Sequence, residues 1–254
     1  MMVFVYLKVG VVAVLANLDT ILFDLDGTLL PMETDRFIDL YYDGLAITGE
    51  PYGFDRQYLF DVIEEAFVAM IHNPGTMTNK ELFFSHVKDN AGSNYDVVCE
   101  IFERFSDREF DKVKECTGFN PMAGQWIKTL KAKGYRVILA TNPLFPGRCT
   151  ERRIRWAGMD PEDFELVTSY ENHFYAKPSK EYYKEIIAQE KLVPENCLMV
   201  GNDVREDMIA KELGMEVFLL KNNIVNSRNL DYSMYPQGFY EEFTEVINSL
   251  PSLI

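Results

Sequence analysis

The sequence predicts an α/β fold: a Rossmann-like, doubly wound parallel sheet with an inserted α-helical domain. Through the second half of the chain, short apolar runs alternate with segments of helical periodicity, which favours a parallel sheet covered by helices. Residues 32–118 show helical periodicity alone. A length of 254 residues, 47% of them hydrophobic, suits one large domain that carries a smaller insertion. We therefore expect a core made of residues 1–31 and 119–254 and a helical domain made of residues 32–118.

The expected strands of the core are apolar runs, and most of them end in polar residues. The runs cover residues 21–23, 135–140, 197–200 and 214–220. The polar side chains that directly follow the first three runs are Asp24 and Asp26, Thr141 and Asn142, and Asn202 and Asp203. Open α/β sheets bind ligands outside the carboxyl ends of their strands, so we expect these side chains to share one site.

The helices are expected from apolar residues spaced three and four apart and from capping residues. In the insertion we expect helices over residues 37–45, 59–70 and 79–89, and a fourth that starts at residue 93 or 94 and ends near 105. Asp55 can cap the second, and Thr78 with Glu81 forms a capping-box pattern before the third. In the core we expect helices over residues 121–134, 146–157, 180–189, 207–213 and 241–250. Residues 232–238 are expected to be a loop.

Asp24 and Asp26 form the most informative pair in the chain. If the first strand persists, carboxylates two residues apart point the same way. One can then act as a nucleophile while the other moves a proton, and both can help to hold a hard cation. The plainer interpretation is an acidic turn, because Asp-Gly is common in turns.

The pattern of residues 23–28 resembles the first motif of the haloacid dehalogenase (HAD) superfamily. Three segments similar to its partner motifs follow in order. They are the strand-terminal Thr141, Lys177 next to Pro178, and the acidic stretch Gly201-Asn202-Asp203 with Asp207. The resemblance covers about residues 18–221, and residues 32–118 stand where the family carries its helical C1 cap. Four motifs in order are far more specific than any one of them.

The resemblance implies a Mg²⁺-dependent phosphatase that acts on a small phosphorylated metabolite through an aspartyl-phosphate. Asp24 would be the nucleophile, and Asp26 would protonate the leaving group and then activate water. Thr141, Asn142 and Lys177 would bind the phosphoryl group. The implied metal ligands are Asp24, the backbone carbonyl of Asp26, and a set drawn from Asn202, Asp203 and Asp207. Which of these last three ligates directly stays open, because many relatives carry Asp where this chain has Asn202.

The negative net charge of the chain limits the kinds of partner that it can bind. The formal net charge is −15, which argues against nucleic acid or an anionic membrane surface as a partner. A phosphorylated substrate therefore needs local cations, which Mg²⁺ and Lys177 would supply. Arg148, Arg152 and Arg153 are interpreted as a solvated helix face.

The cysteines indicate a reducing compartment. Cys99, Cys116, Cys149 and Cys197 form no C-x-x-C pair and are too few for a disulfide scaffold in a chain of this length. We therefore expect reduced thiols and a cytoplasmic location.

The amino-terminal stretch is open to three interpretations. Residues 3–16 are almost entirely apolar but short for a membrane-spanning helix, and Lys8 lies within the stretch rather than before it, unlike the order of a signal peptide. The stretch can reflect a translation start assigned too early, form an extra strand, or make a dimer contact. The oligomeric state, a dimer included, is therefore left open.

Four alternatives to a phosphatase have to be considered for this chain. In haloacid dehalogenases the acid two residues after the nucleophile is absent, so Asp26 favours phosphoryl chemistry. A phosphonatase would need a cap lysine, but Lys80 and Lys88 are interpreted as surface charges. A sugar phosphomutase shares the C1 cap and all four motifs. A weakly active HAD-like regulatory or binding protein is the remaining alternative, and Asn202 is its only support.

Overall fold

The computed structural model describes residues 17–254, so the expectations for residues 3–16 lie outside the described residues. A six-stranded sheet forms the centre of the core, and all of its strand pairs are parallel. The strands are β1 Thr20–Phe23, β2 Arg136–Leu139, β3 Leu166–Val167, β4 Cys197–Gly201, β5 Glu216–Leu220 and β6 Gln237–Gly238. Their order is β3-β2-β1-β4-β5-β6, so the chain winds to one side of β1 and then to the other. The expected doubly wound fold is confirmed.

The register of the sheet brings the ends of three strands together. Phe23, the last residue of β1, lies opposite Leu139 of β2 and Val200 of β4. The chain reverses its winding between β1 and β4, and such switch points are where open α/β sheets bind ligands. The residues that follow Phe23, Leu139 and Val200 are therefore placed at one edge by the register alone.

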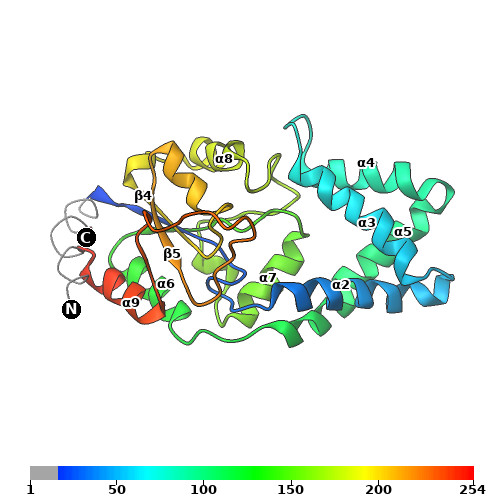
Figure 1. The fold of residues 1–254 in the computed structure, drawn as a ribbon, viewed down its shortest axis with the longest axis horizontal. Coiled ribbons are helices and arrows are strands. Elements are labelled where there is room, and N and C mark those ends of the chain that lie inside the picture. The colour runs from blue at the N-terminus through cyan, green and yellow to red at the C-terminus, as the bar shows by residue number, and fades with distance from the viewer. Residues whose placement is uncertain (1–16) are drawn as a thin grey trace.

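Helices cover both faces of the sheet (Figure 1). One face carries α6 Ala123–Ala132 and α9 Tyr240–Ser249, and the other carries α8 Lys180–Glu190 and the 3-10 helix η8 Met208–Leu213. Successive strand residues serve opposite faces: Phe23 packs with Phe243 of α9, whereas Leu22 lies in the cluster that holds Tyr182 of α8. This two-sided burial explains why successive residues in β1, β2, β4 and β5 are apolar after the first position.

The insertion folds as packed helices that stand apart from the sheet (Figure 1). Its helices are α2 Thr34–Gly49, α3 Arg56–Ile71, α4 Asn79–Ala91 and α5 Tyr95–Arg104, followed by the irregular helical segments η4 Phe105–Glu109 and η5 Phe110–Cys116. Asp55 accepts a hydrogen bond from the Tyr58 backbone N–H at 2.8 Å and caps α3. Thr78 and Glu81 cap α4 reciprocally. Both caps confirm the expected helix starts.

The two chain segments that join the insertion to the core lie side by side. The Gly118 N–H donates to the Pro31 carbonyl at 2.8 Å, and the Glu33 N–H donates to the Cys116 carbonyl at 3.1 Å. This pairing lies next to the domain boundaries that we expect after residues 31 and 118. The boundaries themselves stay a prediction.

One core side chain enters the helical insertion. Phe145, in the loop between β2 and α7 Gly147–Trp156, has its ring centroid 5.6 Å from that of Phe37, 5.5 Å from Tyr41 and 5.4 Å from Phe67. Aromatic pairs at these separations stabilise beyond simple burial. The loop that carries Thr141 and Asn142 is therefore tied to the cap through Phe145.

In the carboxyl-terminal part, one expectation is confirmed and one is wrong. The helix expected over residues 207–213 is present as the 3-10 helix η8, and Gly214 ends it with φ +96°. The expected loop of residues 232–238 contains β6, whose Gly238 carbonyl accepts from the Lys221 N–H at 2.9 Å. Pro236 and Gly238 favoured the interpretation of a loop, because both residues are typical of turns and of sheet edges. The two-residue β3 also carried no apolar run long enough to predict it.

Within residues 17–254, the structure contains no helix of the length and hydrophobicity that a membrane crossing requires.

Candidate active site

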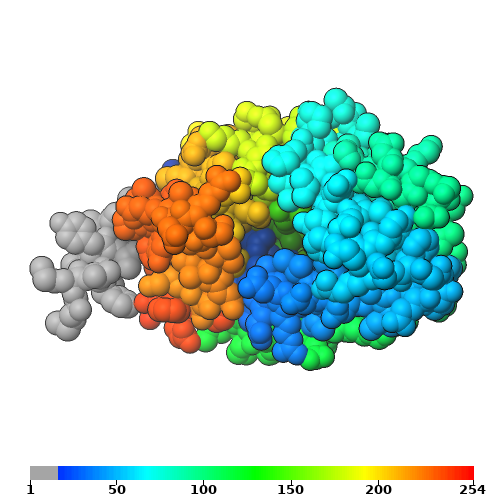
Figure 2. All heavy atoms as spheres, turned by 45° about the vertical axis from the view of Figure 1, so that its right-hand side comes forward, coloured from blue at the N-terminus to red at the C-terminus, as the bar shows by residue number. Residues whose placement is uncertain are grey.

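A pocket of about 210 Å³ opens at the carboxyl ends of the central strands. It is lined by Asp24, Asp26, Thr34, Thr141, Asn142, Asn202, Asp203, Glu206, Asp207 and Val225. Figure 2 shows a hollow between the cap helices and the loops of the core, with the segment that follows β1 at its floor. Every expected site residue except Lys177 lines this pocket, and Lys177 lies directly beneath it in contact with Asp24.

Asp24 is fixed at the end of β1. Its N–H donates to the Val200 carbonyl of β4 at 2.9 Å, and the Ala140 N–H beyond β2 donates to the Phe23 carbonyl at 2.7 Å. These bonds extend the strand register to the first residue after β1. The backbone of Asp24 is therefore held by the sheet, so its carboxylate has a fixed starting position.

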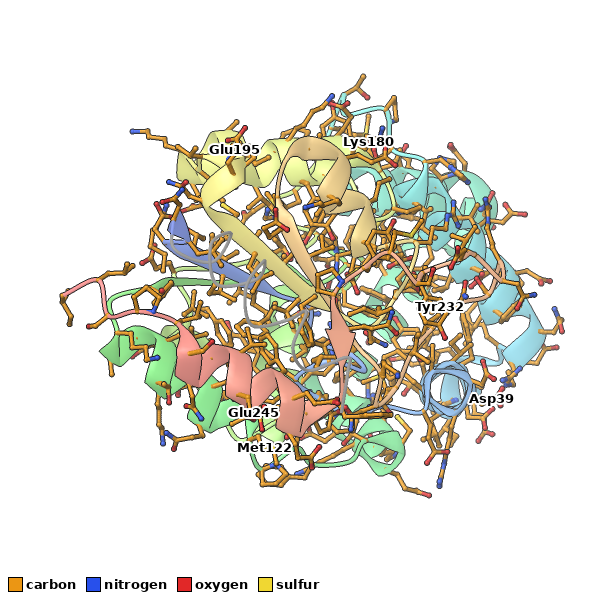
Figure 3. The ribbon with its side chains drawn as sticks, turned by 60° about the vertical axis from the view of Figure 1, so that its left-hand side comes forward. Asp39, Met122, Lys180, Glu195, Tyr232 and Glu245 are labelled. Atoms are coloured by element: carbon orange, nitrogen blue, oxygen red, sulfur yellow. The ribbon has the colours of Figure 1, made fainter. Side chains whose placement is uncertain are left out.

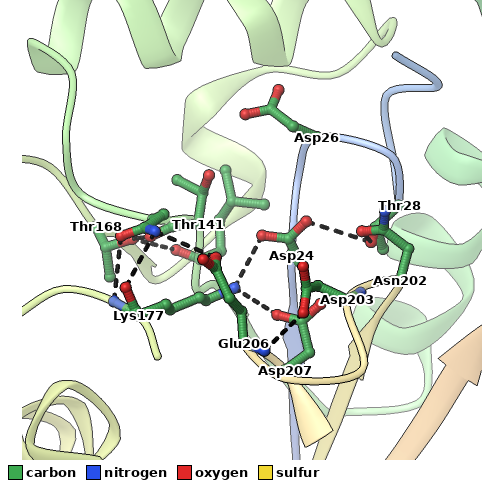
Figure 4. Close-up of polar contacts among 12 residues, drawn as sticks. Asp24, Asp26, Thr28, Thr141, Thr168, Lys177, Asn202, Asp203, Glu206 and Asp207 are labelled. Carbon is green, nitrogen blue, oxygen red and sulfur yellow. Dashed lines mark hydrogen bonds and ion pairs between the residues drawn. The ribbon is translucent and has the colours of Figure 1, made fainter. Parts of the chain in front are cut away.

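Lys177 is buried between two carboxylates (Figure 4). Its Nζ donates to Asp24 Oδ1 at 2.9 Å and to Asp207 Oδ1 at 2.6 Å, and its side chain is 1% exposed. Burial alone would lower the pKa of Lys177, but the negative charges of Asp207 and Asp24 outweigh it and hold that pKa above its usual value. The side chain stays an ammonium ion that orients Asp24.

Gly27 lets the side chain of Asn202 approach the loop after β1. Gly27 has φ +83°, and a Cβ at this position would lie 2.2 Å from Asn202 Nδ2. The Asn202 amide is held from both ends, because Oδ1 accepts from the Thr28 hydroxyl at 2.9 Å and Nδ2 donates to the Asn223 carbonyl at 2.7 Å. Thr28 also contacts Asp24 Oδ2 at 3.3 Å. The amide oxygen of Asn202 and Asp24 Oδ2 thus share the Thr28 hydroxyl.

Asp203 and Asp207 have different surroundings. Asp203 Oδ1 accepts the backbone N–H groups of Arg205 at 2.7 Å and Glu206 at 2.8 Å, so this carboxylate caps its own loop. Asp207 is fully buried and accepts from Lys177 and, through Oδ2, from the Asp203 N–H at 2.9 Å. Each acid therefore has a structural task, whereas the Asn202 amide oxygen shares the Thr28 hydroxyl with Asp24 Oδ2.

Thr141 and Asn142 flank the pocket, and their loop is held by the core. The Thr141 carbonyl accepts from the Thr168 hydroxyl at 2.6 Å and from the Tyr182 hydroxyl at 2.9 Å. Asn142 Oδ1 accepts the Lys177 N–H at 3.2 Å. These bonds place the Thr141 hydroxyl at the pocket wall, where it can donate to a phosphoryl oxygen.

Glu206 is a pocket residue that we did not expect from the sequence. Its Oε2 accepts from Asn142 Nδ2 at 3.2 Å. Burial, opposed by Lys177 and reinforced by Asp203 and Asp24, raises the pKa of Glu206 to about 7. No sequence signal singles it out, because a Glu beside an acidic motif is normally an exposed helix residue.

Asp26 is paired with Arg153 of α7, which corrects the interpretation of that arginine as a solvated residue. The Arg153 guanidinium donates to Asp26 Oδ2 and, at 3.1 Å, to the Thr150 hydroxyl, and it lies 4.9 Å from the Phe145 ring centroid. Its side chain is 1% exposed. Burial, opposed by Arg153, raises the pKa of Asp26 to about 6. Figure 4 shows the Asp26 carboxylate turned away from that of Asp24.

Two further arginines of α7, Arg148 and Arg152, contact the cap. Arg148 pairs with Glu103 and Asp107, both at 2.6 Å. Arg152 donates to the Ser106 carbonyl at 2.9 Å. Neither is free to clamp a substrate in this arrangement.

The donors around Asp24 suit a hard cation. Carboxylate, amide and backbone carbonyl oxygens are the ligands that Mg²⁺ prefers, and the pocket lining holds no histidine or cysteine. Across residues 17–254, no three His, Cys, Asp or Glu side chains are arranged as a ready metal site.

A family model matches most of the chain. It is the model of haloacid dehalogenase-like hydrolases, and it matches residues 18–214. The chain belongs to the haloacid dehalogenase-like hydrolase family. It is therefore a hydrolase by family, and the match spans β1 to η8, including the cap and every expected site residue.

Solved structures of this family share the fold. A predicted phosphoglycolate phosphatase from Haemophilus somnus 129PT is 16% identical with a TM-score of 0.57, over 91% of this chain and 98% of that one. A HAD-hydrolase from Bacillus subtilis, bound to magnesium in its structure, is 17% identical with a TM-score of 0.55, over 91% and 99%. A dehalogenase is 11% identical with a TM-score of 0.54, over 90% and 96%. No curated protein matches the sequence.

Proposed function

We propose that this HAD hydrolase is a Mg²⁺-dependent phosphatase that cleaves a small phosphorylated metabolite through an aspartyl-phosphate on Asp24. The observation that carries the proposal is the position of Asp24 at the end of β1. One of its oxygens is bound to Lys177 at 2.9 Å, and a second carboxylate, Asp26, lines the same pocket. A predicted phosphatase and a magnesium-bound HAD-hydrolase are among the structures that share this fold.

In the first step, a carboxylate oxygen of Asp24 attacks phosphorus and the bond from phosphorus to the leaving oxygen breaks. Asp26 gives its proton to that oxygen, which requires its side chain to turn from Arg153 towards Asp24. The Thr141 hydroxyl donates to a phosphoryl oxygen. Lys177 keeps Asp24 oriented and balances part of the charge.

In the second step, Asp26 takes a proton from water, and the resulting hydroxide attacks the phosphorus of the acyl phosphate. The bond between phosphorus and the Asp24 oxygen breaks, which releases inorganic phosphate and restores the carboxylate. A bound Mg²⁺ would offset the negative charge of the phosphoryl oxygens. Asp24, the Asp26 carbonyl and Asn202 would hold it, with Asp207 behind them.

The dehalogenase alternative shares the nucleophile but not the acid. A dehalogenase is among the similar structures, at 11% identity, where the likeness concerns the fold alone. Asp26 favours the phosphatase, because displacement of a halide needs no proton donor. A sugar phosphomutase would use all of the proposed residues, and a weakly active binding protein would keep them without turnover.

Hydrolysis of p-nitrophenyl phosphate with Mg²⁺ and with EDTA tests the proposal. We expect turnover with Mg²⁺, loss with EDTA, and loss in Asp24→Asn, whose amide cannot form the acyl phosphate. Release of halide from a 2-haloacid, without phosphatase activity, would favour the dehalogenase. Transfer of phosphate between positions of a sugar phosphate would favour the mutase. An Asp24→Asn variant that keeps more than a trace of the wild-type rate would refute the nucleophile.

A further inference from the structure

The lining of the pocket is unusually acidic. Five carboxylates contribute to it: Asp24, Asp26, Asp203, Glu206 and Asp207. The lining contains no lysine, arginine or histidine. Even with one Mg²⁺ bound, the negative charges of the lining and of a phosphate dianion outnumber the positive charges in the site.

Lys177 and Arg153, the two cations among residues 17–254 that contact the proposed catalytic carboxylates, are already paired with them. Lys177 is bound to Asp24 and Asp207, and Arg153 to Asp26. The cap-facing arginines of α7 are used by Glu103, Asp107 and a backbone carbonyl. A carboxylate or second phosphate on the substrate would find none of these cations unpaired and would face the acidic lining instead.

Glu206 has no task in the proposed chemistry. Its only hydrogen-bond partner through a carboxylate oxygen, among residues 17–254, is Asn142 at 3.2 Å, and it forms no ion pair there. Asn142 follows Thr141, so Glu206 lies beside the expected phosphoryl-binding loop. Glu206 therefore presents a carboxylate acceptor at the pocket that a ligand donor can satisfy.

We propose that the site selects phosphomonoesters whose alcohol part is cationic or neutral, above all phosphates of amino alcohols. Glu206 is the residue that distinguishes substrates by the charge of this alcohol part. The inference rests on the proposed phosphatase function. A protonated amine offers both positive charge and hydrogen-bond donors to Glu206, a neutral polyol offers donors alone, and a carboxylate offers neither. The expected order of substrates is therefore amino-alcohol phosphate, polyol phosphate, carboxylated phosphate.

The first test compares three substrates of similar size with the wild-type protein, at pH 8 and saturating Mg²⁺. They are phosphoethanolamine, glycerol phosphate and phosphoglycolate. We expect kcat/KM for phosphoethanolamine to exceed that for phosphoglycolate by at least ~10-fold, with glycerol phosphate between them. An equal or higher kcat/KM for phosphoglycolate overturns the inference.

The second test uses Glu206→Gln, which keeps the side-chain length and can still contact Asn142. We expect the ratio of kcat/KM for phosphoethanolamine over glycerol phosphate to fall by roughly 10-fold. The matched control is Glu245→Gln on α9, which Figure 3 places on the face of the sheet opposite α8; it should leave the ratio unchanged. A ratio that Glu206→Gln leaves unchanged refutes the role of Glu206.

Hydrolysis of p-nitrophenyl phosphate by the wild type distinguishes a failure of the proposed phosphatase function from a failure of the inference about substrate charge. If the protein cleaves this substrate but prefers phosphoglycolate, the inference about charge fails while the proposed function stands. If it cleaves no phosphomonoester at all, the proposed function fails and the inference with it.

Discussion

Arg153, a fully buried arginine on α7, is ion-paired with Asp26, which lies 127 residues earlier in the chain and two residues after the proposed nucleophile. The guanidinium is also held by Thr150 and lies over the Phe145 ring, which packs into the cap. The orientation of Asp26 is thus connected to the contact between core and cap. A buried charge of this kind is costly to leave unpaired.

We expect Arg153→Met to destabilise the protein by on the order of 3 kcal/mol, because it leaves the Asp26 carboxylate partly buried without its cation. Urea unfolding measures this loss. Arg155→Met on the same helix is the control, since Arg155 is exposed and pairs only with Glu151 at 3.3 Å. If Asp26→Asn and Arg153→Met prove additive in a double-mutant cycle, the two side chains are not coupled.

Asp26→Asn should slow turnover by roughly 10²–10⁴-fold, because the leaving oxygen loses its proton donor and water its base. The loss should be smaller for p-nitrophenyl phosphate than for an alkyl phosphate, since p-nitrophenolate leaves without much protonation. Steady-state rates with both substrates check this. Equal losses for the two would argue against Asp26 as a general acid.

We propose Asn202, rather than Asp203, as the direct metal ligand, because its amide oxygen and Asp24 Oδ2 both accept from the Thr28 hydroxyl. Asn202→Ala should raise the Mg²⁺ concentration needed for half-maximal activity. Asn202→Asp should lower it but also lower the melting temperature without metal, since a carboxylate would then face the Asn223 carbonyl that now accepts from Nδ2 at 2.7 Å.

Asp203→Asn serves as the comparison for Asn202→Ala. Its Oδ1 caps the backbone N–H groups of Arg205 and Glu206, so we expect a loss of stability with a smaller shift of the Mg²⁺ titration. Asp207→Asn should lie between the two, because it also loosens Lys177. A titration that shifts with Asp203→Asn but not with Asn202→Ala would assign the metal to Asp203.

Glu206 should make the metal-free protein less stable as the pH rises. Its pKa is about 7 in the folded protein, above the usual 4.5, so the folded state retains a proton that the unfolded chain has already released. The stabilisation is present below about pH 4.5 and is lost as the pH rises through 7. Urea unfolding in EDTA at pH 5 and pH 8 should show a smaller pH difference for Glu206→Gln than for the wild type. An identical difference would mean that the carboxyl group titrates normally.

Local sequence determined the elements and most of the site. Asp55 and the Thr78–Glu81 pair marked helix starts correctly, because a cap bonds within a few residues of its own helix. Asp24, Thr141 and Asn202 were expected at one edge because each follows a buried apolar run. Parallel strands in register then bring such residues together, whichever side chains surround them.

Only the tertiary structure decided which charges are paired. Nothing near Arg153 in the sequence distinguishes it from Arg155 on the same helix, yet one is buried against Asp26 and the other is exposed beside Glu151. Likewise, the sequence left Asn202, Asp203 and Asp207 as alternatives, and the structure gives each a different partner: Thr28, the loop N–H groups and Lys177. The physical reason is that an ion pair or a ligand position depends on burial and on partners more than a hundred residues away, which no local pattern records.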